Sequence, residues 1–127
     1  MASVKVADIM SKNVLTVSPS TSLRDAAAVM LKRNVGCVVV MEDDKCVGIL
    51  TERDFLRLFY ERVDAEEPVE KYMSKNVITI RDSASVNEAK NIMVSQRIRH
   101  LPVIDYSNRL IGILSMRDVF ERIQTVI

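Results

Sequence analysis

A hydroxyl residue followed three positions later by an aspartate occurs twice, each time after the same apolar residues. GILTERD occupies residues 48–54 and GILSMRD residues 112–118. At this spacing a Thr or Ser hydroxyl can cap a helix N-terminus while the acid reaches back to the N–H of the cap residue. A short acid at a helix start can also accept hydrogen bonds from a ribose diol, and the neighbouring backbone N–H groups suit a phosphate. The repeated phrase is therefore a pair of helix caps, a pair of ligand-binding acids, or both.

The duplication extends over the whole chain. MSKNV occurs at residues 10–14 and again at 73–77, and further matches continue at a shift of 63 positions until the turn near Asp44, after which the shift is 64. One residue inserted in a turn explains this change. The acidic stretch 64–68 ends in proline and is the natural linker. We therefore divide the chain into two repeats, residues 1–62 and 63–127.

Each repeat is predicted to have the element order β-α-β-β-α. The first helices should begin after capping-box serines, Ser22 and Ser85, because apolar residues follow them at spacings of three and four. The second helices should begin at Thr51 and Ser115. Strands are expected at 15–17, 37–41 and 46–50, and at 78–80, 101–104 and 110–114. Strands such as VVVM are apolar on both faces and need cover on both sides. We expect an α+β fold in which the repeats pack through their strands with pseudo-two-fold symmetry.

Composition excludes several classes of function. The chain has 127 residues with a net charge of +1 and no Trp, which argues against a basic, base-stacking nucleic-acid surface. Cys37 and Cys46 form no disulfide framework and are expected to be reduced core thiols. With His100 as the single imidazole, neither a zinc site nor a His-dependent catalytic group is predicted. No secretory or membrane-spanning segment is evident, so a cytoplasmic location is expected.

The order and spacing of these segments resemble the CBS domain family, named for cystathionine β-synthase. The resemblance rests on MSKNVLTVSPSTSLRDAAAVM, on RIRHLPVID in the second repeat, and on GILTERD and GILSMRD. It covers about residues 5–62 and 68–126, nearly the whole chain. The chain thus looks like a stand-alone pair of CBS domains, often called a Bateman module.

The resemblance implies two clefts between the repeats that bind AMP, ADP, ATP or S-adenosylmethionine as regulatory ligands, with no catalytic cofactor and no metal. In the family the acid closing the phrase holds the ribose, a role that falls on Asp54 and Asp118, and the hydroxyl three residues earlier, Thr51 or Ser115, contacts ribose or phosphate. Adenine would lie near two groups of residues, Thr16, Val17 and Ser18 with Val35, Gly36 and Cys37, and Thr79, Ile80 and Arg81 with Ile98, Arg99 and His100. If the clefts are shared as in the family, Asp118 works with the first group and Asp54 with the second.

The two clefts are not expected to be equivalent. Arg99 offers a permanent forked donor for phosphate, and His100 adds a donor whose charge varies near neutral pH. Their counterparts Gly36 and Cys37 carry no charge. We therefore expect unequal affinities, with the stronger phosphate selectivity where Arg99 and His100 reach, and a mild bias there against S-adenosylmethionine. Three further arginines, Arg53, Arg81 and Arg117, face either phosphate or solvent.

The leading hypothesis is a non-catalytic sensor that binds an adenosine compound and passes its binding state to an unidentified partner protein. The helix faces, or the segment around Phe59 and Tyr60, are candidate surfaces for contact with that partner. The resemblance also implies a homodimer that forms a disc of four CBS domains. The alternative is a structural or assembly module without a physiological ligand, in which Asp54 and Asp118 are only helix caps. A membrane or nucleic-acid role is not favoured.

Overall fold

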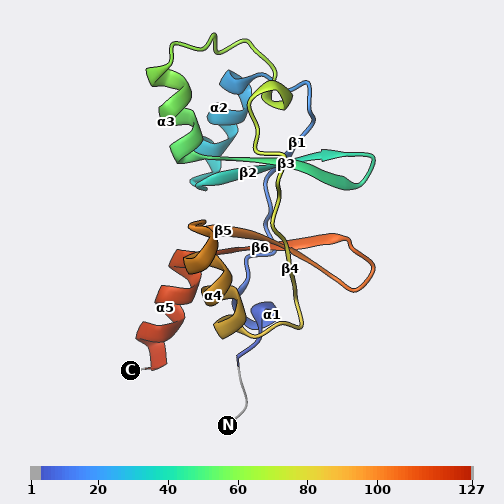
Figure 1. The fold of residues 1–127 in the computed structure, drawn as a ribbon, viewed down its shortest axis with the longest axis vertical. Helices are drawn as coiled ribbons and strands as arrows, with labels where there is room; N and C mark the ends of the chain where they lie inside the picture. The colour runs from blue at the N-terminus through green and yellow to red at the C-terminus, as the bar shows by residue number, and fades with distance from the viewer. Residues whose placement is uncertain (1–3, 127) are drawn as a thin grey trace. The chain divides into compact units, whose positions relative to one another are not determined.

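Each repeat folds as predicted into short strands and amphipathic helices. The structure, a computed structural model, describes residues 4–126 (Figure 1). The elements of the first repeat are α1 (Val6–Ile9), β1 (Thr16–Val17), α2 (Leu23–Arg33), β2 (Cys37–Glu42), β3 (Lys45–Thr51) and α3 (Glu52–Tyr60). Those of the second are η1 (Val69–Lys71), β4 (Ile80–Arg81), α4 (Val86–Gln96), β5 (His100–Ile104), β6 (Leu110–Ser115) and α5 (Met116–Val126). The α+β prediction is confirmed.

The strands form two three-stranded sheets with the same topology, β1-β2-β3 and β4-β5-β6. The first strand of each sheet is parallel to the second, because a helix connects them, and the second and third form an antiparallel hairpin. In each sheet the two long helices lie on one face (Figure 1). The central strand β2 is buried over residues 37–40, which agrees with its apolar pattern on both faces. Such burial anchors the ends of the hairpin, where the repeated phrase lies.

Local capping fixes the ends of the first helix in each repeat. The hydroxyl of Ser22 accepts a 3.0 Å hydrogen bond from the N–H of Asp25, and that of Ser85 accepts one of 3.0 Å from Glu88. Both helices end in a left-handed residue, with φ of 55° at Asn34 and 56° at Arg97. The predicted serine caps are therefore confirmed.

The change of shift from 63 to 64 lies in the hairpin turns. The first turn has two residues with positive φ, Asp43 and Asp44, the arrangement that matches strand twist in tight hairpins. Between the equivalent pairs Val40–Gly48 and Val103–Gly112, the second hairpin has one residue more, and its strands end earlier, at Ile104 and Leu110. In its turn the side chain of Asp105 accepts hydrogen bonds from the N–H groups of Ser107, at 2.8 Å, and Arg109, at 3.0 Å. The inserted residue is thus accommodated by a wider turn.

The compact units of the structure do not coincide with the repeats of the sequence. One unit contains residues 1–14 and 78–127, and the other residues 15–77. In the first unit the leading segment bridges Ser11 to Ile113 on β6, and in the second Ser74 bridges to Ile49 on β3. Each copy of MSKNV therefore begins beside the closing strand of the other repeat. The division at residues 62 and 63 remains a description of the duplication, while packing divides the chain near residues 14 and 77.

Two short elements that the sequence did not predict hold these exchanged segments in place. α1 and η1 occupy equivalent positions before MSKNV, and Val6 and Val69 are both fully buried. The N–H of Val6 donates to the carbonyl of Ala84 at 2.8 Å, and the N–H of Val69 donates to that of Thr21 at 2.8 Å. Each valine belongs to the apolar core of its unit.

The glycine of the repeated phrase is required by a methionine of the repeated MSKNV. A Cβ added at Gly48 would clash with Sδ and Cγ of Met73, and one added at Gly112 would come within 2.6 Å of Sδ of Met10. At Gly112 the backbone carbonyl of Ser11 also lies only 3.0 Å from the added Cβ. Met73 and Met10 both pack partly buried against the apolar cores of their units. The glycine and the methionine therefore recur together, because Met73 covers Gly48 and Met10 covers Gly112.

We expect Gly48→Ala to lower the free energy of unfolding by about 1–3 kcal/mol through overpacking. Met73→Ala should relieve part of that loss, so the double variant should be more stable than the sum of the two single changes predicts, by about 1 kcal/mol. Urea denaturation of the four proteins measures this coupling. At Gly112 the obstructing Ser11 carbonyl cannot rotate away, so Met10→Ala should rescue Gly112→Ala less. Equal rescue at both glycines would contradict the assignment.

Candidate functional site

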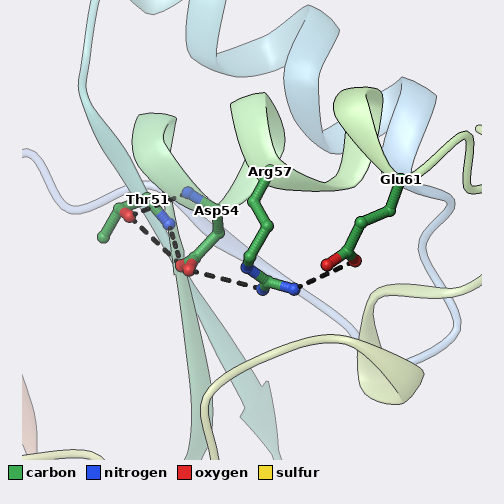
Figure 2. Close-up of polar contacts among 4 residues, drawn as sticks. All are labelled: Thr51, Asp54, Arg57 and Glu61. Carbon is green, nitrogen blue, oxygen red and sulfur yellow. Dashed lines mark hydrogen bonds and ion pairs between the residues drawn. The ribbon is translucent and has the colours of Figure 1, made fainter.

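The first copy of the phrase forms a complete capping box (Figure 2). Oδ2 of Asp54 accepts hydrogen bonds from the backbone N–H of Thr51 at 2.8 Å and from its hydroxyl at 3.1 Å. The N–H of Asp54 donates back to the Thr51 hydroxyl at 3.4 Å. The other carboxylate oxygen, Oδ1, lies outside the box, and the Asp54 side chain is 27% exposed. One oxygen of the acid therefore fixes the helix start while the other is turned away from the cap.

The second copy repeats this geometry. Oδ2 of Asp118 accepts a 2.9 Å hydrogen bond from the N–H of Ser115, and the N–H of Asp118 donates to the Ser115 hydroxyl at 3.1 Å. Asp118 is also partly buried. The sequence-based interpretation of the phrase as a helix cap is thus confirmed for both copies. A ligand-binding role for the same acids remains compatible, because the cap uses only one oxygen of each carboxylate.

Strand register brings the start of the central strand against each capping box. Cys37 pairs with Thr51 across the first hairpin, and the N–H of Glu52 donates to the carbonyl of Gly36 at 3.0 Å. The second hairpin pairs His100 with Ser115, and the N–H of Met116 donates to the backbone carbonyl of Arg99 at 2.8 Å. Within each unit, therefore, the uncharged Gly36 and Cys37 adjoin the first acid, whereas Arg99 and His100 adjoin the second.

The first-strand residues lie elsewhere in their units. Thr16 pairs with Val39 and Val17 with Val40, on the side of β2 away from β3. They are therefore about two strand spacings, roughly 10 Å, from β3 and farther along β2 than the cap. The hydroxyl of Ser18 lies 3.1 Å from that of Thr21, in the loop that leads to α2.

The same separation holds in the other unit, where Ile80 pairs with Val103. Beside β4 an open pocket of about 310 Å³ includes the predicted residues Thr79, Ile80 and Arg81, and is completed by Ser83, Ala84, Glu88 and Ile92. Two other predicted residues, Val35 and Ile98, pack partly buried against the cores of their units.

The candidate phosphate-binding cations are accessible. Four predicted arginines, Arg53, Arg81, Arg99 and Arg117, are exposed. Arg117 pairs through Nε with Oε1 of Glu121 at 3.0 Å along α5. The sequence reasoning missed Arg57, whose Nη2 lies 3.7 Å from Oδ1 of Asp54. The i,i+3 spacing of Asp54 and Arg57 was the available signal.

The two thiols are uncharged at neutral pH. Cys37 is buried, and this burial, with a smaller contribution from the charge of Glu52, raises its pKa to about 12. Burial also raises the pKa of Cys46, which is only partly buried. Cys37 is therefore the core thiol predicted from the sequence, and it presents an apolar surface beside the first cap.

Among residues 4–126, no group of three or more His, Cys, Asp or Glu side chains is placed to hold a metal ion. None of the helices in that part of the chain has the length and apolar character needed to cross a membrane. The cytoplasmic location stays a prediction.

Comparison with known families identifies the duplicated unit. The family described as "CBS domain" matches residues 6–61 and again residues 69–125. The chain belongs to the CBS domain family. The resemblance read from the sequence is confirmed, and each of the two matches ends shortly after a copy of the capping box. The repeated phrase, GILTERD or GILSMRD, therefore lies near the C-terminal end of each CBS domain.

Relatives and solved structures agree with this assignment. The CBS domain-containing protein YhcV of Bacillus subtilis is 37% identical over 94% of this chain and 84% of its own length. Inosine-5'-monophosphate dehydrogenase of Methanocaldococcus jannaschii is 37% identical over 94% of this chain, but over only 24% of its own length.

Among solved structures, the CBS domain pair of protein MJ0100, in complex with 5-methylthioadenosine and S-adenosyl-L-methionine, has a TM-score of 0.92 and 26% identity, covering 99% of this chain and 100% of that one. CBSX2 in complex with AMP has a TM-score of 0.84 and 27% identity, covering 97% and 98%. The tandem CBS fold is thus shared with proteins that were crystallised with adenosine compounds.

We expect the buried thiol of Cys37 to make the free energy of unfolding decrease at alkaline pH. An unfolded Cys37 ionises near its ordinary pKa of 9.0, whereas the folded thiol keeps its proton up to about pH 12. The stabilisation is therefore fully present below pH 9 and is lost between pH 9 and 12. At 1.36 kcal/mol per pKa unit, wild type should lose about 2 kcal/mol more than Cys37→Val between pH 8 and 10.5 in urea denaturation. Parallel pH curves for the two proteins would contradict this.

Proposed function

We propose that this chain is a non-catalytic regulatory module that binds an adenosine-containing ligand at Asp54 and Asp118. The observation that carries the proposal is the duplicated capping box, in which Oδ2 of each acid accepts the hydrogen bond from the cap residue and Oδ1 is not part of the cap. A fixed carboxylate with one oxygen outside the cap suits the hydroxyls of a ribose, as in dinucleotide-binding folds. The AMP and S-adenosylmethionine complexes of similar CBS proteins support the same ligand class.

The surroundings of the two acids support unequal ligand preferences. Arg99 and His100 begin β5 beside Ser115, whereas Gly36 and Cys37 begin β2 beside Thr51. A guanidinium recognises phosphate through forked donors. We propose that phosphate selectivity among AMP, ADP, ATP and S-adenosylmethionine depends most on Arg99 and His100. The first-strand residues of the predicted set remain proposed adenine contacts.

A regulatory output requires a second protein or a second copy. The matched region forms about a quarter of the Methanocaldococcus jannaschii dehydrogenase, so a similar CBS pair there belongs to a larger enzyme. In the present case we propose that ligand binding biases two arrangements of the CBS pair through differential affinity, and that a partner protein detects the change.

A ligand-independent assembly module is the second candidate. It is favoured by the fact that both capping boxes are complete with protein groups alone. Under this alternative Asp54 and Asp118 contribute only to stability, by about 0.5–2 kcal/mol each as helix caps.

Thermal melting of wild type, Asp54→Asn and Asp118→Asn distinguishes the two candidates. Each protein is melted without ligand and with AMP, ADP, ATP or S-adenosylmethionine. A ligand at one hundred times its Kd should stabilise wild type by about 2.7 kcal/mol, a shift of several degrees for a chain of this size. The regulatory proposal predicts that an Asn variant loses much of this shift.

The melting temperature of each variant without ligand is the control. A variant that melts earlier without ligand but retains the full ligand-dependent shift has lost only a cap. If no adenosine compound shifts wild type, the assembly candidate replaces the regulatory one.

We further propose that the chain forms a homodimer through its helices, as the resemblance implied for a disc of four CBS domains. Leu31 and Leu56 are 83% and 70% exposed, and their repeat equivalents Val94 and Phe120 are 64% and 62% exposed. The same apolar positions are thus uncovered in both repeats. A second copy presents the matching residues, as a two-fold interface requires.

Leu56→Glu combined with Phe120→Glu should convert the dimer into a monomer, because two charges would be placed in an apolar interface. Sedimentation equilibrium measures the change in mass. Tyr106→Glu is the matched control, since Tyr106 is 84% exposed but lies in a hairpin turn. A monomeric wild type, or a dimer that survives both substitutions, would contradict the proposal.

A further inference from the structure

The two ribose acids differ in the residue one helical turn beyond them. Nη2 of Arg57 lies 3.7 Å from Oδ1 of Asp54, and its Nη1 lies 3.4 Å from Oε1 of Glu61. Figure 2 shows the guanidinium between the two carboxylates, along the side of α3. In the second repeat the residue equivalent to Arg57 is an acid, Glu121, which pairs with Arg117.

We propose that Arg57 is a specificity-determining residue that competes with a ribose diol for Oδ1 of Asp54 and so weakens this acceptor. The inference rests on the proposed function, because it concerns one of the same acids. It goes beyond the duplicated phrase, since both copies of that phrase contain the hydroxyl and the acid but only the first has an arginine three positions after the acid.

The competition follows from how the carboxylate is already used. Oδ2 of Asp54 accepts two hydrogen bonds within the capping box, so Oδ1 is the oxygen left for a ligand. Arg57 lies beside that oxygen and partly neutralises its charge. A ribose hydroxyl that approaches Oδ1 must displace the guanidinium or share the oxygen with it. At Asp118 the equivalent position holds Glu121, which pairs with Arg117 at 3.0 Å, so this position supplies no cation to compete for the carboxylate.

The arrangement disfavours Arg57 as a phosphate-binding residue. Both branches of its guanidinium are directed to carboxylates of its own helix, Asp54 and Glu61. Recruiting Arg57 to a phosphate would break both ion pairs. Adenosine and AMP separate the two roles, because adenosine has the ribose but no phosphate.

The effect should be small and sensitive to salt. The Arg57 and Asp54 side chains are 49% and 27% exposed, and ion pairs at such positions contribute roughly 0.2–1 kcal/mol. This corresponds to a change in Kd of up to about five-fold. Salt screens exposed charges, so the difference should shrink in 0.5 M NaCl, where the Debye length is well below the roughly 10 Å of 0.1 M salt.

Calorimetric titration of adenosine and AMP into the full chain tests the proposal. The Asp118→Asn background isolates the Asp54 acceptor. Adding Arg57→Gln to this background should tighten adenosine binding by about two- to five-fold at low salt. Lys32→Gln, an exposed lysine on α2, removes the same charge from the same unit and should leave Kd unchanged.

If wild type binds AMP, three results would overturn the inference and leave the proposed function intact. In the first, Arg57→Gln leaves the Kd for adenosine unchanged. In the second, Arg57→Gln weakens the binding of AMP alone, which would assign Arg57 to phosphate. In the third, the Asp118→Asn protein binds neither compound, with or without Arg57→Gln. If wild type binds neither adenosine nor AMP, the proposed function itself fails, and the inference with it.

A reciprocal variant keeps the test independent of Asp118→Asn folding. In an Asp54→Asn background, Glu121→Arg places a cation beside Asp118 and should weaken adenosine binding there by about two- to five-fold. Unchanged binding in this variant would contradict the proposed competition.

Discussion

The hydrogen bond between a backbone N–H at the end of a hairpin and an acid in the first turn of the next helix controls the geometry of this CBS pair. It joins Thr51 to Asp54 at 2.8 Å and Ser115 to Asp118 at 2.9 Å. Because the N–H belongs to the last strand residue and the acid to the helix, this one bond fixes where the strand stops and where the helix begins. It also orients the carboxylate. Structural and ligand-binding interpretations of the phrase therefore describe one arrangement, with a different oxygen serving each purpose.

Packing explains why the apolar part of the phrase is repeated as strictly as its polar part. Gly48 and Gly112 lie under Met73 and Met10, so any side chain at either glycine would displace the MSKNV segment. That segment bridges to the strand that leads into the capping box. The position of each acid consequently depends on a segment from the other repeat. The two sites differ in the residues around the caps. Arg99 takes the place of Gly36 beside the cap, and Glu121 takes the place of Arg57 one turn beyond the acid.

Much of this could be predicted from the sequence, because its signals are local or periodic. Caps at Ser22 and Ser85, the β-β hairpins and the extra residue in the second turn follow from spacing within a few residues. The exchange of leading segments could not be predicted, since it depends on contacts between residues far apart in the chain, such as Ser11 with Ile113. α1 and η1 are too short to show periodicity. Arg57 was not predicted because candidate residues were taken from positions that both repeats share, and the second repeat has Glu121 at the equivalent position.

The most direct test of the central claim is a crystal structure of the chain grown with AMP. We predict that the ribose hydroxyls lie within hydrogen-bonding distance of Oδ1 of Asp118, or of Asp54, with both capping boxes unchanged. AMP bound away from both acids, or a carboxylate that must leave its cap to reach the ribose, would contradict the account.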